Sequence, residues 1–174
     1  KLPKRRKDSK KGDNGRVLVI GGSKDYVGAV ALAGLAALRS GADWVTVVAP
    51  EKVAWCVNSL SHDIVSVKLN GEYFSLKHAN QVLKLAKKYD IVLIGNGVGL
   101  ERETRQFLKK IIKKIKNVKV LDADGIKALS VRDLENTIIT PHVKELGHFL
   151  SNSKVNKKLV KGIINEPDIE KKAS

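Results

Sequence analysis

Short apolar runs alternate with helical patterns along the chain, and this alternation limits the possible folds more than any other feature of the sequence. Runs without polar residues are typical of strands that are buried on both faces of a parallel sheet. Their alternation with helices favours a three-layer αβα sandwich with a mainly parallel central sheet. The predicted strands are 17–20, 44–49, 64–67, 91–94, 118–121 and 137–140, and the predicted helices are 28–40, 51–60, 76–88, 102–116, 125–130 and 143–150. The helix 28–40 is rich in Ala and Leu and is expected to be buried.

The two ends of the chain depart from this pattern. Residues 1–16 are basic and carry few apolar side chains, so we interpret them as an N-terminal arm. Beyond residue 151, lysine and asparagine dominate and the helical pattern is weak. A chain of 174 residues has room for one domain with a substantial core. We therefore expect a basic arm over 1–16 and a single α/β domain over 17–174.

The charge of the chain is strongly positive. Its formal net charge is +15, from 33 Lys and Arg against 18 Asp and Glu. Such a field attracts polyanions, but the basic residues are spread over the arm and several predicted helix faces. Aromatic residues make up only 5% of the chain, and no motif for reading RNA or DNA is present. We expect no specific nucleic-acid partner.

The sequence also bears on cellular location. No apolar run approaches the roughly 18 residues that span a bilayer, and the first residues do not resemble a secretory signal. The single cysteine, Cys56, cannot form an intrachain disulfide, which fits a reducing compartment. We expect a cytoplasmic protein with no membrane partner. Cys56 itself is interpreted as a small core residue, with a reactive thiolate as the alternative.

Residues with chemical potential follow the predicted strands. Glycines follow two of them, in GGSKDYVGA (21–29) and GNGVG (95–99), acids follow a third in DADG (122–125), and a histidine follows the last in TPH (140–142). The carboxyl ends of parallel strands lie at one edge of the sheet, and ligands bind there in such folds. The sequence therefore predicts one site at this edge.

The glycine segments have two interpretations each. GGSKDYVGA precedes a predicted helix, where free backbone N–H groups attract a phosphate, or it is only a tight strand-to-helix turn. It matches neither the Walker loop nor the G-x-G-x-x-G dinucleotide fingerprint. GNGVG forms either a flat backbone floor under a ligand or a loop that requires positive φ. The residues alone leave these alternatives open.

The acidic and histidine segments are treated in the same way. Asp124 is expected to cap the following helix, and Asp122 is the better candidate to meet a ribose hydroxyl or a metal-bound water. Pro141 ends the sheet ladder, which leaves His142 at the rim, either as a ligand contact or as an ordinary loop residue. His78 is expected to lie exposed on a helix.

Together these segments resemble the ADP/ATP-dependent NAD(P)H-hydrate dehydratases, which have a ribokinase-like domain. The block KGDNGRVLVIGGSKDYVGAVALAGLAALRSGADWVTVVAPE is similar to the start of that domain, GNGVG to its GPGLG, LDADGI to its DADAL and TPHVKEL to its TPHxGE. The resemblance covers nearly all of 10–150. It implies a lyase that repairs hydrated NADH or NADPH by phosphorylating the ring hydroxyl from ADP or ATP, with Mg²⁺ on the phosphates, and then eliminating phosphate.

The resemblance also implies site residues. Ala29, Gly99 and His142 correspond to substrate-binding positions of the family, and Asp122 is expected to line the same site. Two neighbours depart from the family pattern, since Asn96 replaces a proline and Lys144 replaces a glycine.

The family's Gly-Thr-Gly-Asp motif, whose Asp is the expected general base, has no match in the sequence. We therefore expect a C-terminally incomplete domain without a catalytic residue or a protein metal ligand, inactive by itself. The alternative is a non-catalytic nucleotide-binding relative that keeps only the substrate site. Homo-oligomers, tetramers among them, are also implied by the resemblance.

Overall fold

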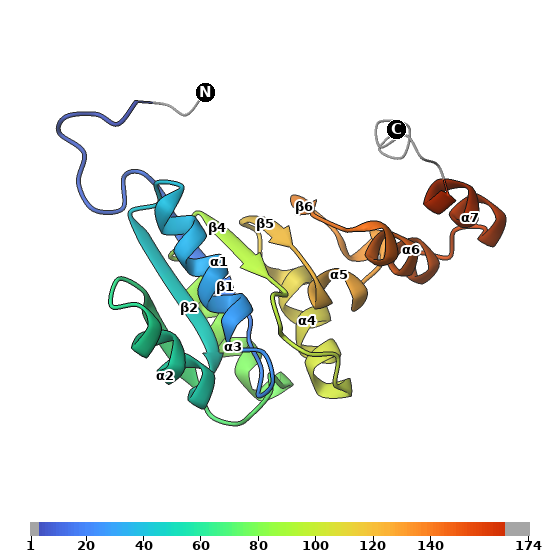
Figure 1. The fold of residues 1–174 in the computed structure, drawn as a ribbon, viewed down its shortest axis with the longest axis horizontal. Coiled ribbons are helices and arrows are strands. Elements are labelled where there is room, and N and C mark those ends of the chain that lie inside the picture. Colours follow the sequence, from blue (N-terminus) through green and yellow to red (C-terminus); the bar gives the residue numbers. More distant parts are fainter. Residues whose placement is uncertain (1–3, 166–174) are drawn as a thin grey trace.

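The computed structural model describes residues 4–165, which form a six-stranded, all-parallel sheet with helices on both faces (Figure 1). The strand order is β3-β2-β1-β4-β5-β6. The strands are β1 (Arg16–Ile20), β2 (Trp44–Pro50), β3 (Val65–Leu69), β4 (Ile91–Ile94), β5 (Val118–Leu121) and β6 (Thr137–Ile139). The α-helices are α1 (Gly28–Arg39), α2 (Glu51–Leu60), α3 (Ala79–Ala86), α4 (Arg102–Lys114), α5 (Asp124–Lys127), α6 (Val143–Asn152) and α7 (Lys157–Asn165), and two 3₁₀ turns are η1 (Leu76–His78) and η2 (Val131–Asp133). The predicted parallel α/β class is confirmed.

Alternate residues of each strand enter two separate cores. In β1, Leu18 and Ile20 pack into a core with α3, α4 and Phe149 of α6, whereas Val19 packs into a second core with α1 and α2. This division follows from the period-two geometry of a strand, which sends successive side chains to opposite faces. It also explains the apolar runs in the sequence, since both faces of the central strands are covered.

Some predicted elements differ from the observed ones. The single helix predicted over 76–88 is split into η1 and α3, because the side chain of His78 accepts the N–H of Ser75 at 3.1 Å and tightens the first turn. The helix predicted over 125–130 is only the short α5. A further helix, α7, lies in the lysine-rich segment after 151, where the pattern is weak; its apolar side faces α6 through Val160 and Ile164.

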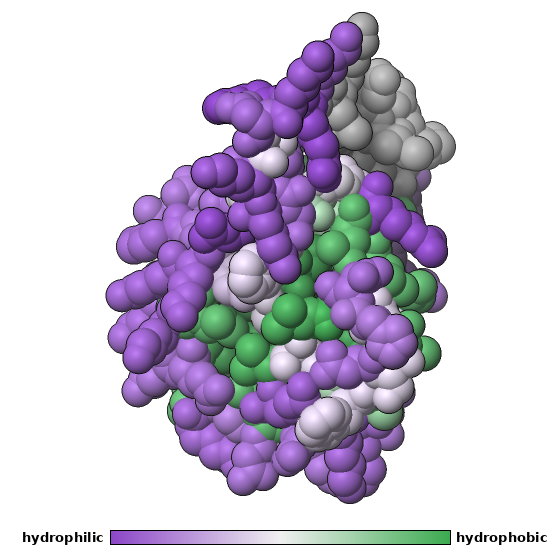
Figure 2. All heavy atoms as spheres, turned by 90° about the vertical axis from the view of Figure 1, so that its left-hand side faces the viewer, coloured by the Kyte–Doolittle hydropathy of each residue, from purple (hydrophilic) through white to green (hydrophobic). Residues whose placement is uncertain are grey.

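Three predictions about burial were wrong. His78 is buried, because its Nε2 lies 2.9 Å from the carbonyl oxygen of Asn70, and burial lowers its pKa. Cys56 is exposed, since it lies on the outer side of α2. The helix α1 is buried only on its inner side, and Leu32 is 69% exposed. Hydrophobic surface is accordingly visible on the side of the molecule seen in Figure 2.

The N-terminal arm is held by one carboxylate. Asp43, in the turn before β2, accepts the backbone N–H groups of Gly12 and Asn14 and pairs with Arg5 at 3.2 Å. These contacts, the Asn14 N–H first among them, lower the pKa of Asp43. Asp43 is thus an anchor for the arm.

None of the helices within residues 4–165 is both long enough and apolar enough to cross a membrane.

Candidate functional site

The site predicted at the carboxyl edge of the sheet lies next to the point where the strand order reverses, between β1 and β4. Strands β2 and β3 lie on one side of β1, and β4, β5 and β6 lie on the other. Ligands of open parallel sheets bind outside the strand ends at such a switch point. The loops after β1 and β4 are joined there, because the N–H of Gly22 donates to the carbonyl of Asn96 at 2.8 Å.

Asp122 follows β5 and joins the loops on both sides of it. One carboxylate oxygen accepts the amide N–H of Asn96 at 2.8 Å, and the other accepts the hydroxyl of Thr140 at 2.8 Å. Hydrogen bonds to a carboxylate are among the stronger ones in proteins. The exits of β4, β5 and β6 are therefore fixed relative to one another, and Asp122 is partly exposed between them.

Asp124 does not cap α5, contrary to the prediction. It is the first residue of that helix, after Ala123 with φ of 51°. Its carboxylate instead accepts the N–H of Gly99 at 3.2 Å and pairs with Lys127 at 2.9 Å. The hydrogen bond with Asp124 raises the pKa of Lys127. Asp124 therefore holds the glycine loop after β4 against α5.

His142 is the N-cap of α6 and has a defined orientation. Its Nδ1 accepts the N–H of Lys144 at 3.2 Å, and its Nε2 lies 3.4 Å from Oε1 of Glu145. The buried Glu145 also accepts the backbone N–H of His142 at 3.2 Å and lies 3.9 Å from Lys127. The accepting Nδ1 places the proton of the neutral ring on Nε2. The side chain is 62% exposed, so a ligand has access to the ring.

Ala29 is placed separately from these residues. It is exposed in the first turn of α1, where backbone N–H groups are free for an anion. The preceding loop reaches the exit of β4, because Tyr26 packs on Gly97 so closely that an added Cβ on Gly97 would lie 2.6 Å from the Tyr26 Cβ.

The structure thus links Gly99, Asp122 and His142 through neighbouring loops, and it brings Ala29 to the same edge. Three linking residues were not predicted as part of the site: Thr140, Lys127 and Glu145. Position directly after a strand was a signal for Thr140, but the partners of Lys127 and Glu145 come from other elements and required the fold.

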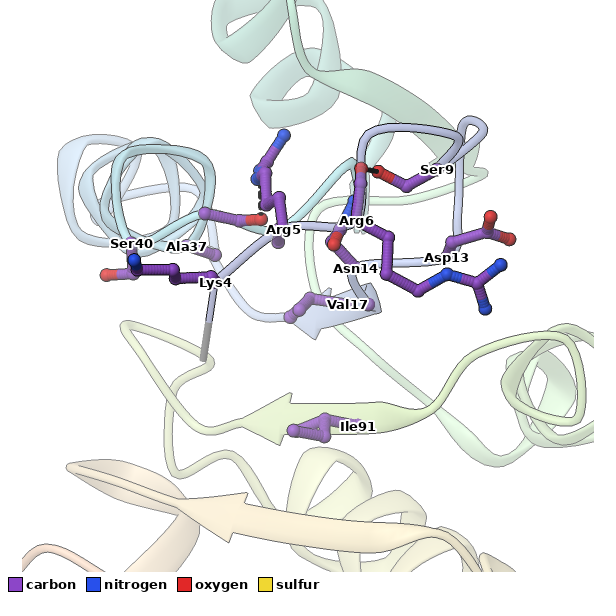
Figure 3. Close-up of a pocket in the computed structure, with 13 residues that line it drawn as sticks. Lys4, Arg5, Arg6, Ser9, Asp13, Asn14, Val17, Ala37, Ser40 and Ile91 are labelled. Atoms are coloured by element: carbon purple, nitrogen blue, oxygen red, sulfur yellow. Dashed lines mark hydrogen bonds between the residues drawn. The ribbon is translucent and has the colours of Figure 1, made fainter. Parts of the chain in front are cut away.

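A cavity lies at the opposite edge of the sheet. It has a volume of about 940 Å³ and is lined by the arm, by Val17 and Ile91 at the starts of β1 and β4, and by Ala37 of α1 (Figure 3). Because ligands of open parallel sheets bind at the carboxyl ends, we assign the candidate site to the loops around Asp122 and not to this cavity.

Known proteins resemble this chain in sequence and in fold. The bifunctional NAD(P)H-hydrate repair enzyme of Pyrobaculum aerophilum is 43% identical over 81% of this chain and 29% of its own length. The ADP-dependent (S)-NAD(P)H-hydrate dehydratase of Nitrosopumilus maritimus is 33% identical over 88% of this chain and 56% of its own. The chain therefore spans well under two thirds of these relatives.

Solved structures show the same fold. A ribokinase-like superfamily protein from Enterococcus faecalis has a TM-score of 0.73, at 23% identity over 96% of this chain and 55% of its own. The ADP/ATP-dependent NAD(P)H-hydrate dehydratase of Bacillus subtilis, co-crystallised with ATP and Mg²⁺, has a TM-score of 0.69, at 24% identity over 99% of this chain and 56% of its own. The ribokinase-like fold is confirmed.

Residues 17–166 match the family model described as NAD(P)H-hydrate dehydratase, which is most of the chain. The sequence match, the relatives and the fold agree, and the chain belongs to the NAD(P)H-hydrate dehydratase family.

Proposed function

We propose that this chain forms the substrate-binding part of a dehydratase that repairs hydrated NADH and NADPH at the expense of ADP or ATP. The observation that carries the proposal is the bonded set of loops that presents Gly99, Asp122 and His142 at one edge of the sheet. Family membership supplies the reaction class.

The proposed reaction proceeds in two steps. The ring hydroxyl oxygen attacks the terminal phosphorus of the nucleotide, the bond to the leaving nucleotide breaks, and the hydroxyl proton passes to a base. The ring C–O bond then breaks with loss of phosphate and of a neighbouring ring proton, which restores the double bond. Neither step changes the oxidation state of the cofactor.

Each predicted residue has a role that its surroundings support. The free N–H groups around Ala29 at the start of α1 suit a phosphate. Gly99 is held by Asp124 and has no side chain, and the flexible Glu101 carboxylate is what lies where a Cβ would be. The ring of His142 is fixed by Glu145 and is exposed enough to touch the nicotinamide or ribose. Asp122 has a second lone pair on each oxygen for a hydroxyl or a bound ion.

Mg²⁺ fits this arrangement as an ion carried by phosphates. No group of three or more His, Cys, Asp or Glu within residues 4–165 forms a metal cage, and Mg²⁺ at phosphate sites needs only one or two carboxylates. Asp122 is the candidate carboxylate, because it is partly exposed between the strand exits, whereas Asp124 and Glu145 contact Lys127. When bound, the ion would neutralise charge on the transferred phosphoryl group.

The test separates binding from turnover. The 174-residue chain is titrated calorimetrically with ADP and Mg²⁺ and with hydrated NADH, and turnover is followed by the return of NADH absorbance. We expect binding without turnover. His142→Ala is expected to weaken the binding of hydrated NADH by about tenfold, which is the effect of one lost hydrogen bond. His148→Ala, on the same helix and also exposed, is the matched control.

The outcomes discriminate between functions. Absence of binding to both ligands would remove the proposal. Binding of ADP alone, unaffected by His142→Ala, would favour the non-catalytic nucleotide-binding relative. Turnover by the chain alone would show that the base lies within these residues and would refute the expected inactivity.

A further inference from the structure

Asn96 connects the loop after β4 to the exits of both neighbouring strands. It lies between Gly95 and Gly97, whose φ angles are 125° and 65°. Its backbone carbonyl accepts the N–H of Gly22, after β1, at 2.8 Å. Its side-chain amide donates to Oδ2 of Asp122, after β5, also at 2.8 Å. The bond to Gly22 fixes the backbone of Asn96, so its amide is held within reach of the carboxylate.

The orientation of the Asn96 amide is set by Asp122. The oxygen of that amide, Oδ1, is buried and has no hydrogen-bond partner within residues 4–165. A half-turn of the amide would exchange its oxygen and nitrogen and place Oδ1 against Oδ2 of Asp122. Both atoms are acceptors when the carboxyl group is ionised, so they would repel each other. The amide therefore donates to Asp122 and leaves its own oxygen unsatisfied.

The pair of Asn96 and Asp122 contributes little to the stability of the fold. A hydrogen bond to an ionised group stabilises a protein by about as much as one buried, unsatisfied acceptor destabilises it. The two effects of the Asn96 side chain therefore nearly cancel. Buried polar atoms without a partner are uncommon in folded proteins, and a role at a functional site is one reason that they persist. Because Asn96 lies at the candidate site, we look for its role in the orientation of Asp122.

A second donor holds the other oxygen of the same carboxylate. The hydroxyl of Thr140, after β6, donates to Oδ1 of Asp122 at 2.8 Å. One donor on each oxygen, from the loops on either side, fixes the rotation of the carboxylate. Thr140 is the looser of the two donors, because it is exposed and its hydroxyl also lies 3.3 Å from the carbonyl oxygen of Leu121. Within the described part of the chain, Asp122 is the sole acceptor of the Asn96 amide, so Asn96 contributes most to the orientation.

A carboxylate held in one orientation suits a ligand hydroxyl. Each oxygen of Asp122 keeps a lone pair, and the residue is partly exposed at the sheet edge. A group that is already held in its binding orientation loses less conformational entropy when the ligand binds. We propose that Asn96 is a positioning residue, which holds Asp122 in the orientation that accepts a hydroxyl group of hydrated NADH or NADPH. This inference rests on the proposed function, which brings such a ligand to Asp122.

The experiment is a double-mutant cycle in ligand affinity. The 174-residue chain is titrated calorimetrically with hydrated NADH as wild type, Asn96→Ala, Asp122→Ala and the double variant. Asn96→Ala is expected to weaken binding by about fivefold, because the carboxylate is then free to rotate. In the Asp122→Ala background the same change is expected to have no effect, because a positioning residue acts only through the group that it positions. A purely structural role would weaken binding in both backgrounds.

Two further variants complete the test. Asn117→Ala removes an amide that donates to the Tyr89 carbonyl at the opposite edge of the sheet, and it should leave the affinity unchanged. Asn96→Asp keeps the shape of the side chain and loses the donor, so it takes the place of Asn96→Ala in the cycle if circular dichroism shows that the alanine variant does not fold. Equal weakening in both backgrounds, no weakening in either, or the same weakening by Asn117→Ala would overturn the inference and leave the proposed function standing. Absence of binding by the wild-type chain would refute the proposed function, and this inference with it.

Discussion

Replacement of Gly95 by alanine tests how tightly the loops of the candidate site are joined. Gly95 follows β4 with φ of 125°, and its N–H donates to the carbonyl of Ile20 at 3.1 Å. An added Cβ would lie inside the van der Waals distance of the Asp122 carbonyl oxygen and 2.7 Å from the backbone nitrogen of Gly125. Both obstacles are backbone atoms, which cannot rotate away.

The expected loss of stability follows from two terms. A left-handed conformation that only glycine adopts readily costs about 1–3 kcal/mol for another residue. Forcing a methyl group into a packed site costs about 1–3 kcal/mol more. The sum, about 2–6 kcal/mol, is a large share of the roughly 5–15 kcal/mol that stabilises a typical domain. At about 2–4 °C per kcal/mol for a chain of this size, the melting temperature should fall by roughly 4–24 °C.

Thermal and urea unfolding of the purified chain measure this loss. Gly162→Ala is the matched control, because Gly162 lies in α7 and an added Cβ there would meet no atom within 4 Å. In a helix interior that change should stabilise by up to about 1 kcal/mol. If Gly95→Ala unfolds within about 1 kcal/mol of wild type, less than the smallest expected sum, the loops are not held as tightly as the structure indicates.

Three further predictions concern charged groups. Burial lowers the pKa of Lys119 below its ordinary value of 10.5. Between the lowered pKa and 10.5 the unfolded chain binds more protons than the folded chain, so the free energy of unfolding should rise with pH there. Lys119→Met should abolish that rise in alkaline urea titrations. Glu145→Ala removes the acceptor of the His142 N–H and should cost about 0.5–2 kcal/mol, whereas Glu145→Gln, which keeps an acceptor, should cost less in the same melts. The pKa of Asp43 lies below 3.8, so its hold on the arm should persist at neutral pH and be lost on acidification through that lowered value. Asp43→Ala should speed tryptic cleavage of the arm at neutral pH, and an unchanged rate would contradict the anchoring of the arm by Asp43.

The candidate site was predictable as a location but not as a network. Asp122 and His142 follow directly after apolar runs, and in a parallel sheet those positions meet at one edge. The pairing of Asp124 with Gly99, 25 residues away, depends on how α5 lies against the loop after β4. The expectation that Asp124 caps its helix failed because local sequence cannot report a partner from another strand exit.

The sequence by itself determined the strands, the parallel class and the family, because short apolar runs, glycine at strand exits and ordered motifs are local properties of the chain. Tertiary structure decided burial on each side of an element. The Ala- and Leu-rich α1 was expected to be buried, yet Leu32 is exposed. Likewise Val118 of β5 is 45% exposed, whereas Leu18, Val19 and Ile20 of β1 are fully buried. An apolar sequence indicates that a surface favours burial. Only the packing of segments distant in the sequence determines which surfaces within residues 4–165 are buried.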